Sequence, residues 1–249
     1  MLFRQLFERV SSTYTYLLAC EETGQAVLID PVLPTWQRDL GEIRRLGLTL
    51  VCTLDTHIRA EHLTAARRLK SDAHSRSARP ACDALECTDV DVREGAPLEL
   101  GSVRIEPLHT PGHTDGHHAY LLADRVFTGD ALLIDGCGRT DFQNGDAEAL
   151  YHSVHDKLFT LPDETLVYPA HDYEGRRVSS VGQEKQRNPR LGNDRPLAEF
   201  VSLMHALELD YPKFIDYALP GNRQCGACPE GVPDDLRQYC EHIGSSQQG

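Results

Sequence analysis

Five polar side chains lie just beyond the ends of predicted β-strands, and their placement constrains the fold more than any other feature. They are His57, His62, His113, His171 and Asp130. Folds that combine strands and helices carry their chemistry on loops at one edge of a sheet. Imidazole nitrogen and carboxylate oxygen together suit iron, zinc or manganese. Taken singly, such a histidine is more often a surface residue, but the five together predict a metal centre at a sheet edge.

The spacing of apolar residues predicts the strands and helices. Strands are predicted over residues 13–20, 26–30, 48–56, 103–109, 119–123, 125–128 and 166–168, and helices over 35–46, 60–70, 147–159, 178–187 and 196–207. Gly47 is placed to end the first helix, and the stretch over 71–80 is expected to be irregular. Strands outnumber single-helix crossovers, which fits a doubly wound sheet poorly. We therefore expect an α/β fold with two mixed sheets inside and helices outside.

Composition limits the domain count and the partners. A chain of 249 residues fits a single domain over 1–249, with a short C-terminal extension from about residue 221. Its 25 basic and 38 acidic residues give a formal net charge of −13, which opposes binding to nucleic acid. No apolar stretch reaches the roughly 18 residues of a membrane span, so we expect no membrane partner and a cytoplasmic, bacterial-type protein. The oligomeric state stays open, with a homodimer among the states that the sequence allows.

Four short motifs contain the predicted metal ligands. They are residues 56–62 (THIRAEH), 110–114 (TPGHT), 127–130 (FTGD) and 169–172 (PAHD). In this order they resemble the metallo-β-lactamase superfamily, whose first motif is Thr-His-x-His-x-Asp-His. The resemblance implies an αββα four-layer sandwich with the metal at the edge between its two sheets.

Longer stretches resemble one branch of that superfamily, the persulfide dioxygenases, also called sulfur dioxygenases. They cover residues 130–141, 151–155, 168–173 and 188–191, and the similarity runs from about Gln5 to about Cys225. The resemblance implies oxidation of glutathione persulfide with O2 and water to sulfite and glutathione, as in sulfide detoxification. It also implies one Fe(II) per chain, held by His57, His113 and Asp130. Two histidines and one carboxylate leave three coordination positions open, as in non-haem iron oxygenases.

Two residues depart from the superfamily's first motif. Arg59 stands where that motif has its second histidine, and Glu61 where it has aspartate. A guanidinium has no free lone pair and cannot bind a metal, which disfavours a two-metal site. The resemblance implies that persulfide dioxygenases leave this histidine uncoordinated. Arg59 either pairs with Glu61 or Asp172 in place of a second metal, or attracts the negative charge that develops during turnover.

His62 and His171 are expected to act beside the metal ligands. They would orient those ligands, or a water molecule, through hydrogen bonds. Alternatively, both are inherited from a two-metal ancestor. With Glu61 and Asp130 they would form one metal site of a hydrolase, so that alternative stays open.

Three residues match family positions that contact the glutathione part of the substrate. These are Arg139, Tyr173 and Arg190. Glutathione persulfide carries two carboxylates, which an arginine side chain binds with two parallel hydrogen bonds. A surface ion pair is the alternative role for each arginine.

The eight cysteines are scattered, and we expect reduced thiols. Cys225 and Cys228 have the spacing of a redox pair or half of a zinc site, but one such pair without a second favours a structural role. A redox role near the active site is the alternative. His117 and His118 are expected to begin a strand with exposed imidazoles.

Two alternatives to a persulfide dioxygenase remain open. One is a thioester hydrolase of the glyoxalase II type, in which a metal-bound hydroxide attacks an acyl-glutathione. The other is a redox or persulfide sensor without turnover, which would use Cys225 and Cys228. Because the hydrolase shares the fold, the number and identity of the bound metal ions must separate the two enzymes.

Overall fold

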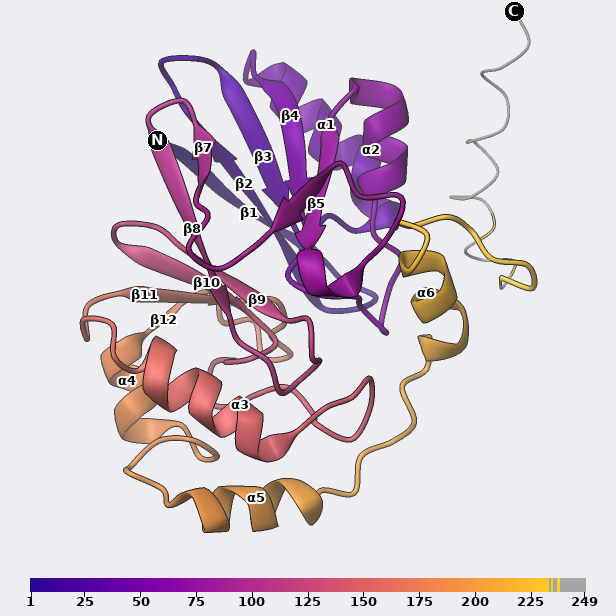
Figure 1. Cartoon of the computed structure of the whole chain (residues 1–249). Coiled ribbons are helices and arrows are strands. Elements are labelled where there is room, and N and C mark those ends of the chain that lie inside the picture. The colour runs from indigo at the N-terminus through magenta and orange to yellow at the C-terminus, as the bar shows by residue number, and fades with distance from the viewer. Residues whose placement is uncertain (233, 235–236, 238–249) are drawn as a thin grey trace, which may run out of the picture.

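The strands form two mixed sheets in a computed structural model that describes residues 1–232, 234 and 237 (Figure 1). The first sheet has the order β1–β2–β3–β4–β5–β6, with bounds Leu2–Glu8, Thr13–Ala19, Gln25–Ile29, Thr49–Leu54, Arg76–Pro80 and Val90–Val92. The second has the order β12–β11–β10–β9–β8–β7, with bounds, from β7 to β12, Leu98–Leu100, Val103–His109, His118–Leu121, Arg125–Gly129, Leu166–Pro169 and Ser179–Ser180. In the first sheet β3 to β6 are parallel, whereas β8, β9 and β10 of the second are antiparallel.

The core between the sheets is built by alternating side chains. In β2, Tyr16 and Leu18 face the second sheet and join the cluster that contains Phe127, whereas Leu17 faces the other way. Successive side chains of a strand point to opposite faces, so a strand packed between the second sheet and a layer of helices is buried on both. This is why all seven residues of β2 are buried.

Helices cover the outer face of each sheet (Figure 1). Helices α1 (Trp36–Arg45) and α2 (Ala66–Ala73) pack on the first sheet, where Ile43 and Leu69 join one apolar cluster. On the second sheet lie α3 (Ala147–Ser153), which continues as a π-helical turn over Val154–Leu158, α4 (Val181–Arg187) and α5 (Leu197–His205). Short 3-10 turns cover Leu33–Thr35 and Ala81–Asp83, and α6 spans Ile215–Asn222. The four layers confirm the predicted αββα sandwich.

The sequence prediction was wrong in two segments near the first sheet. Residues 60–65, predicted as the start of a helix, form a loop, and α2 begins at Ala66. The stretch expected to be irregular contains β5, whose Arg79 is buried because it pairs with Asp55 at 2.8 Å. In both places distant side chains stabilise a backbone that local patterns do not favour. By contrast, Gly47 ends α1 as predicted, with a φ of +69°.

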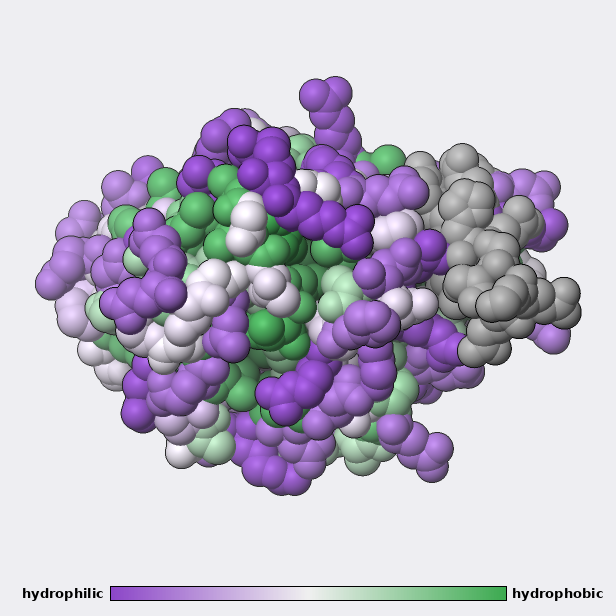
Figure 2. All heavy atoms as spheres, turned by 90° about the horizontal axis from the view of Figure 1, so that it is seen from above, coloured by the Kyte–Doolittle hydropathy of each residue, from purple (hydrophilic) through white to green (hydrophobic). Residues whose placement is uncertain are grey.

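The face seen from above has apolar side chains at its centre and hydrophilic side chains around them (Figure 2). In the part of the chain that the structure describes, no helix combines the length and apolarity needed to cross a membrane. The C-terminal extension expected from about residue 221 starts at the end of α6, and residues 238–249 lie outside the described part.

Candidate metal centre

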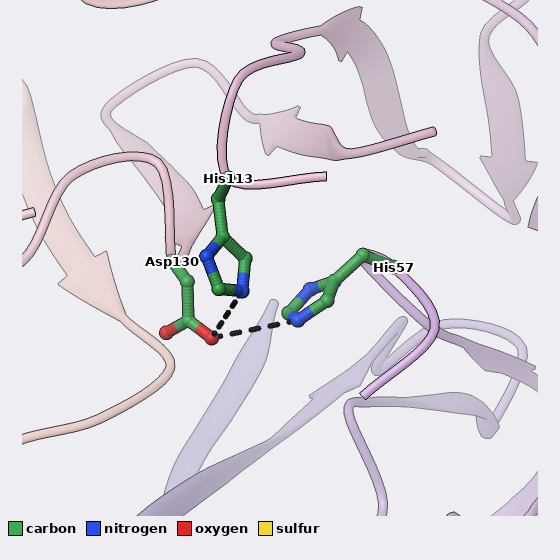
Figure 3. Close-up of side chains that lie close together, drawn as sticks. All are labelled: His57, His113 and Asp130. Atoms are coloured by element: carbon green, nitrogen blue, oxygen red, sulfur yellow. Dashed lines mark ion pairs between the residues drawn. The ribbon is translucent and has the colours of Figure 1, made fainter. Parts of the chain in front are cut away.

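Three side chains from three loops meet at one edge of the two sheets (Figure 3). His57 follows β4, His113 lies between β8 and β9, and Asp130 follows β10 directly. The Nε2 atoms of His57 and His113 lie 3.5 Å and 3.6 Å from Oδ2 of Asp130. One donor atom from each residue lies within 4.8 Å of the other two. The three residues that the sequence placed together are therefore close enough to bind one ion.

Each imidazole of this group is oriented through its other nitrogen. Nδ1 of His113 donates a hydrogen bond to the Arg139 carbonyl at 2.8 Å, which leaves the lone pair on Nε2. Nδ1 of His57 lies 2.9 Å from the Thr56 hydroxyl, which itself donates to Asp30 at 3.1 Å. The Thr56 oxygen is therefore free to accept from Nδ1 of His57. Each ring therefore points its Nε2 at Oδ2 of Asp130.

Among the described residues, two buried polar atoms of the group have no hydrogen-bond partner, Nε2 of His57 and Oδ1 of Asp130. Buried polar atoms are nearly always satisfied, so these two atoms are suited to bind an ion. Burial and the nearby Arg59 charge lower the pKa of His57 well below its usual value, so the ring is neutral at pH 7. A neutral imidazole is the form that binds a metal. The donor set of two nitrogens and one carboxylate thus fits a transition-metal ion.

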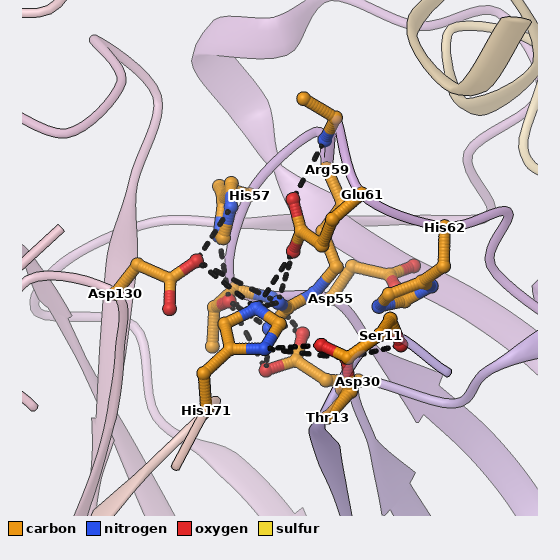
Figure 4. A network of polar contacts seen from close by, with 12 residues as sticks. Ser11, Thr13, Asp30, Asp55, His57, Arg59, Glu61, His62, Asp130 and His171 are labelled. Atoms are coloured by element: carbon orange, nitrogen blue, oxygen red, sulfur yellow. Dashed lines mark hydrogen bonds and ion pairs between the residues drawn. The ribbon is translucent and has the colours of Figure 1, made fainter. Parts of the chain in front are cut away.

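A second group shares Asp130 but already holds a cation (Figure 4). Glu61, Asp130 and His171 also place donor atoms within 4.8 Å of one another. Nη1 of Arg59 lies among them, 2.8 Å from Glu61, 3.1 Å from Nε2 of His171 and 3.7 Å from Asp130. The guanidinium therefore occupies the place where a second metal ion would sit.

Arg59 is buried and is balanced by carboxylates on two sides. Besides Glu61 it pairs through Nη2 with Asp30 at 2.6 Å. Burial disfavours its charge, but Asp30 and Glu61 outweigh this effect and raise the pKa of Arg59. The ion pair that the sequence predicted therefore forms with Glu61. It does not form with Asp172, which pairs with Arg176 at 2.9 Å.

His171 and His62 differ in their surroundings. Burial disfavours a charged His171, but the Asp130 and Glu61 carboxylates outweigh it and raise the pKa of His171 well above the usual value. Its Nδ1 donates to the Ser11 carbonyl at 3.1 Å, and its Nε2 lies 2.8 Å from Glu61. His62 belongs to neither three-residue group, and its Nδ1 contacts the Leu63 carbonyl at 3.2 Å. Burial and the Arg59 charge lower the pKa of His62 to about 4.

Sequence reasoning missed two residues that support the centre. Asp30 anchors Thr56 and Arg59, and His117 accepts a hydrogen bond from the Asp130 backbone N–H at 3.1 Å. The expectation of exposed imidazoles at 117 and 118 was wrong, since His117 is completely buried and His118 is 3% exposed. Asp30 directly follows β3, so the rule that singled out the other strand-end residues would have found it too.

A pocket of about 610 Å³ opens next to the centre and is lined by His113, Asp130 and His171. The three predicted substrate residues, Arg139, Tyr173 and Arg190, also line it. Arg139 forms a two-pronged pair with Asp141 at 2.6 and 2.7 Å, and Arg190 donates to the Cys137 carbonyl at 2.9 Å. Tyr173 is 74% exposed, and its ring is parallel to that of His171. The volume suits a small peptide.

Cys225 is not paired with its near neighbour Cys228. Cys225 forms a disulfide with Cys87, 138 residues earlier in the chain, so the expectation that all cysteines are reduced was wrong. Cys225 therefore cannot act with Cys228 as a vicinal redox pair. The spacing in the sequence gave no sign of this partner, because the fold alone brings residues 87 and 225 together.

The chain is similar to known proteins over most of its length. A sequence model of the metallo-beta-lactamase superfamily matches residues 54–171. The protein called persulfide dioxygenase ETHE1, mitochondrial, of Bos taurus is 47% identical over 234 residues, which cover 91% of this chain and 89% of that protein. The crystal structure of ETHE1 from Myxococcus xanthus is 52% identical with a TM-score of 0.89, and the match covers 91% of this chain and 100% of that one.

A relative with a hydrolytic name matches over a shorter range. The hydroxyacylglutathione hydrolase of a Polaromonas species is 35% identical over 170 residues, which cover 64% of this chain and 62% of that protein. The sequence identity to the Bos taurus and Myxococcus xanthus proteins is therefore higher, and their matches cover more of this chain.

Proposed function

We propose that this chain, which belongs to the persulfide dioxygenase family of the metallo-β-lactamase superfamily, oxidises the sulfane sulfur of glutathione persulfide with O2 and water, and releases sulfite and glutathione. One Fe(II) per chain would be held by His57, His113 and Asp130. When bound, iron supplies the electron transfer to O2 that no amino-acid side chain can perform.

The difference between the two groups that share Asp130 supports a single iron. In the first group, Nε2 of His57 and Nε2 of His113 both lie next to Oδ2 of Asp130, and the other oxygen of Asp130 has no hydrogen-bond partner among the described residues. In the second group, the Arg59 guanidinium lies against Glu61 and His171. A second metal ion there would face the guanidinium charge at contact distance in a buried setting, and His171 would have to release the proton that Asp130 and Glu61 stabilise on it.

The residues around the ligands keep them in place before substrate arrives. The Arg139 carbonyl fixes the ring of His113, Thr56 fixes that of His57, and His117 holds the backbone of Asp130. Such outer contacts typically matter by about 10–100-fold in metal affinity or activity. They leave the side of the centre that faces the pocket free for substrate.

The pocket carries both basic and acidic side chains. Arg139, Arg190 and Lys213 line it together with carboxylates that include Asp135 and Asp210, and the three basic groups are the ones suited to the two carboxylates of glutathione. Arg139 is already held by Asp141, which orients its guanidinium at the pocket wall. Local positive charge of this kind is needed to bind an anion against the net charge of −13.

The hydrolase alternative predicts different chemistry at the same place. A glyoxalase II-type enzyme would hydrolyse an acyl-glutathione with a metal-bound hydroxide. The 35% identical hydroxyacylglutathione hydrolase keeps this alternative worth testing. The position of Arg59 disfavours this hydrolase alternative for any reaction that needs two metal ions.

The test compares one protein preparation in two metal states. Anaerobically purified protein is loaded with Fe(II) or with Zn(II), its metal content is measured, and each form is given glutathione persulfide or S-lactoylglutathione. We expect O2 uptake and sulfite formation from the Fe(II) form alone, with about one iron per chain. Hydrolysis of S-lactoylglutathione without O2 uptake from the persulfide would establish the hydrolase instead. Bound iron with neither activity would favour a sensor.

A further inference from the structure

The end of the described chain packs against the loop that carries His57. The side chain of Asn222, the last residue of α6, is buried and uses its whole amide there. Its Oδ1 accepts from the Thr64 backbone N–H at 2.9 Å, and its Nδ2 donates to the carbonyls of Arg59 at 2.9 Å and His62 at 2.7 Å. Three backbone groups of residues 57–64, here called the 57–64 loop, therefore depend on one side chain.

The 57–64 loop needs such partners because it is neither helix nor strand. Buried backbone N–H and C=O groups must be paired, and apart from an isolated bridge between Thr64 and Val32 no ladder or helical turn among the described residues pairs them. The loop begins at a proposed metal ligand, His57, and contains Arg59 and Glu61, which fill the second group. A shift of its backbone would move His57 and the guanidinium together.

A closed ring of polar contacts ties Asn222 to both ends of this loop. Arg79 donates to the Asn222 carbonyl at 3.1 Å and pairs with Asp55 at 2.8 Å. Asp55 also accepts from the Thr64 hydroxyl at 2.9 Å, and the Thr64 N–H returns to Asn222. All four residues are buried, so the contacts are sheltered from water.

The Cys87–Cys225 disulfide fixes the segment that follows Asn222. Cys225 lies three residues after Asn222, and its carbonyl accepts from the Arg67 backbone N–H at 3.1 Å. Gly226 lies against the Thr64 carbonyl, where a Cβ would collide. Cys225 is buried, whereas Cys87 is only half-buried. The covalent bond thus anchors the chain next to Asn222 at a point that a small thiol can reach.

We propose that Asn222 is a positioning residue for the 57–64 loop and that the Cys87–Cys225 disulfide holds Asn222 in place, so that small thiols weaken metal retention by reducing that bond. A thiolate attacks Sγ of Cys87, the S–S bond breaks, and its electron pair leaves on Cys225 as a thiolate. A second thiolate attacks the mixed disulfide, which releases Cys87 and the oxidised small thiol. In a reducing compartment such as the predicted cytoplasm, protein disulfides are usually transient or redox-sensing.

The first experiment tests Asn222 with Co(II), whose absorption reports its coordination whether or not the protein is a dioxygenase. Asn222→Ala and the isosteric Asn222→Asp are compared with wild type and with Gln224→Ala, an exposed neighbour. We expect the two Asn222 variants to lose Co(II) to EDTA about tenfold faster, with faster amide hydrogen exchange at residues 58–64. Gln224→Ala should match wild type. Folded Asn222 variants that keep the wild-type rate and exchange pattern would overturn the role of Asn222.

The second experiment tests the disulfide. Thiol titration first counts the free cysteines of protein purified in air, and Co(II) loss is then measured before and after incubation with glutathione. Reduced wild type and untreated Cys87→Ser should both lose Co(II) a few-fold faster than oxidised wild type, and glutathione should have no further effect on Cys87→Ser. Cys82→Ser, which alters an exposed cysteine outside the disulfide, should behave like wild type. Free Cys87 and Cys225 in air-purified protein, or equal rates before and after reduction, would overturn the redox control.

Discussion

The two groups that share Asp130 have similar donor atoms, but only the second of them encloses a positively charged side chain. His57, His113 and Asp130 present free lone pairs and an unpaired buried oxygen, whereas Glu61 and His171 enclose the guanidinium of Arg59. Arg59 thus fills the second group with its own positive charge, and the proposed single metal ion would lie beside this built-in cation. The comparison teaches that a side chain which binds no metal can occupy the place of a metal ion.

Asp130 belongs to both groups, so its removal should have the largest effect. Asp130→Ala takes away one of three metal ligands and also a carboxylate near Arg59 and His171. Because changes to outer contacts alone cost about 10–100-fold, we expect metal affinity to fall by more than about 100-fold and O2 uptake to be lost. Metal analysis and oxygen consumption measure this. Asp156→Ala, on the surface, is the control, and retention of iron by Asp130→Ala would show that the ligand assignment is mistaken.

Removing the built-in cation should mainly affect stability. Arg59→Met leaves Asp30 and Glu61 buried or half-buried without their partner. We expect the free energy of unfolding to fall by about 3–5 kcal/mol, measured by chemical denaturation. Arg104→Met, which breaks an exposed pair with Glu106, should cost less than about 1 kcal/mol. Equal losses in the two variants would mean that Arg59 acts as an ordinary surface charge.

The variant Arg59→His isolates the question of metal number. It restores the histidine of the superfamily motif, which persulfide dioxygenases are expected to leave uncoordinated. Iron content should therefore stay near one per chain. Two metal ions per chain in this variant would show that position 59 alone sets the number.

The lowered pKa of the buried His62 predicts that the stability of the folded protein depends on pH. His62 has a pKa lowered to about 4 in the folded protein, against about 6.5 when unfolded. Below pH 6.5 the unfolded chain binds a proton that the folded chain does not, so stability falls as the pH decreases from 6.5 towards 4. At pH 5 this costs about 2 kcal/mol.

Urea unfolding of metal-free protein between pH 8 and 5 measures this slope. His62→Gln should make it less steep, while the buried His57 and His117, whose pKa values are also lowered, keep the remaining slope. The exposed His152→Gln should leave it unchanged. His171 acts in the opposite direction and in another window. Its raised pKa stabilises the folded state at low pH, and this contribution is lost only as the pH rises above 6.5. An unchanged slope in His62→Gln would assign the acid sensitivity to other groups.

The sequence predicted what depends on local pattern and missed what depends on long-range contacts. Two mixed sheets with helices outside follow from strand periodicity, whereas the αββα order and the grouping of His57, His113 and Asp130 came from the resemblance of short motifs to a known family. Asn222 supports a loop 158 residues earlier in the chain, and Cys225 reaches Cys87 over 138 residues. No periodicity or spacing encodes such pairs, because they exist only once the sheets have packed.

A substitution in the substrate pocket next to the metal centre should have the smallest effect on activity. Arg190 lines the pocket and is held by the Cys137 carbonyl at 2.9 Å, so its charge is placed without a full ion pair in the described structure. If it binds a glutathione carboxylate, Arg190→Met removes one charge-assisted contact, and KM for glutathione persulfide should rise about tenfold with kcat nearly unchanged. Arg93→Met, on the exposed surface, should leave both constants alone. A fall in kcat with KM unchanged would instead place Arg190 among the residues that act on the metal centre through the chain segment at Cys137.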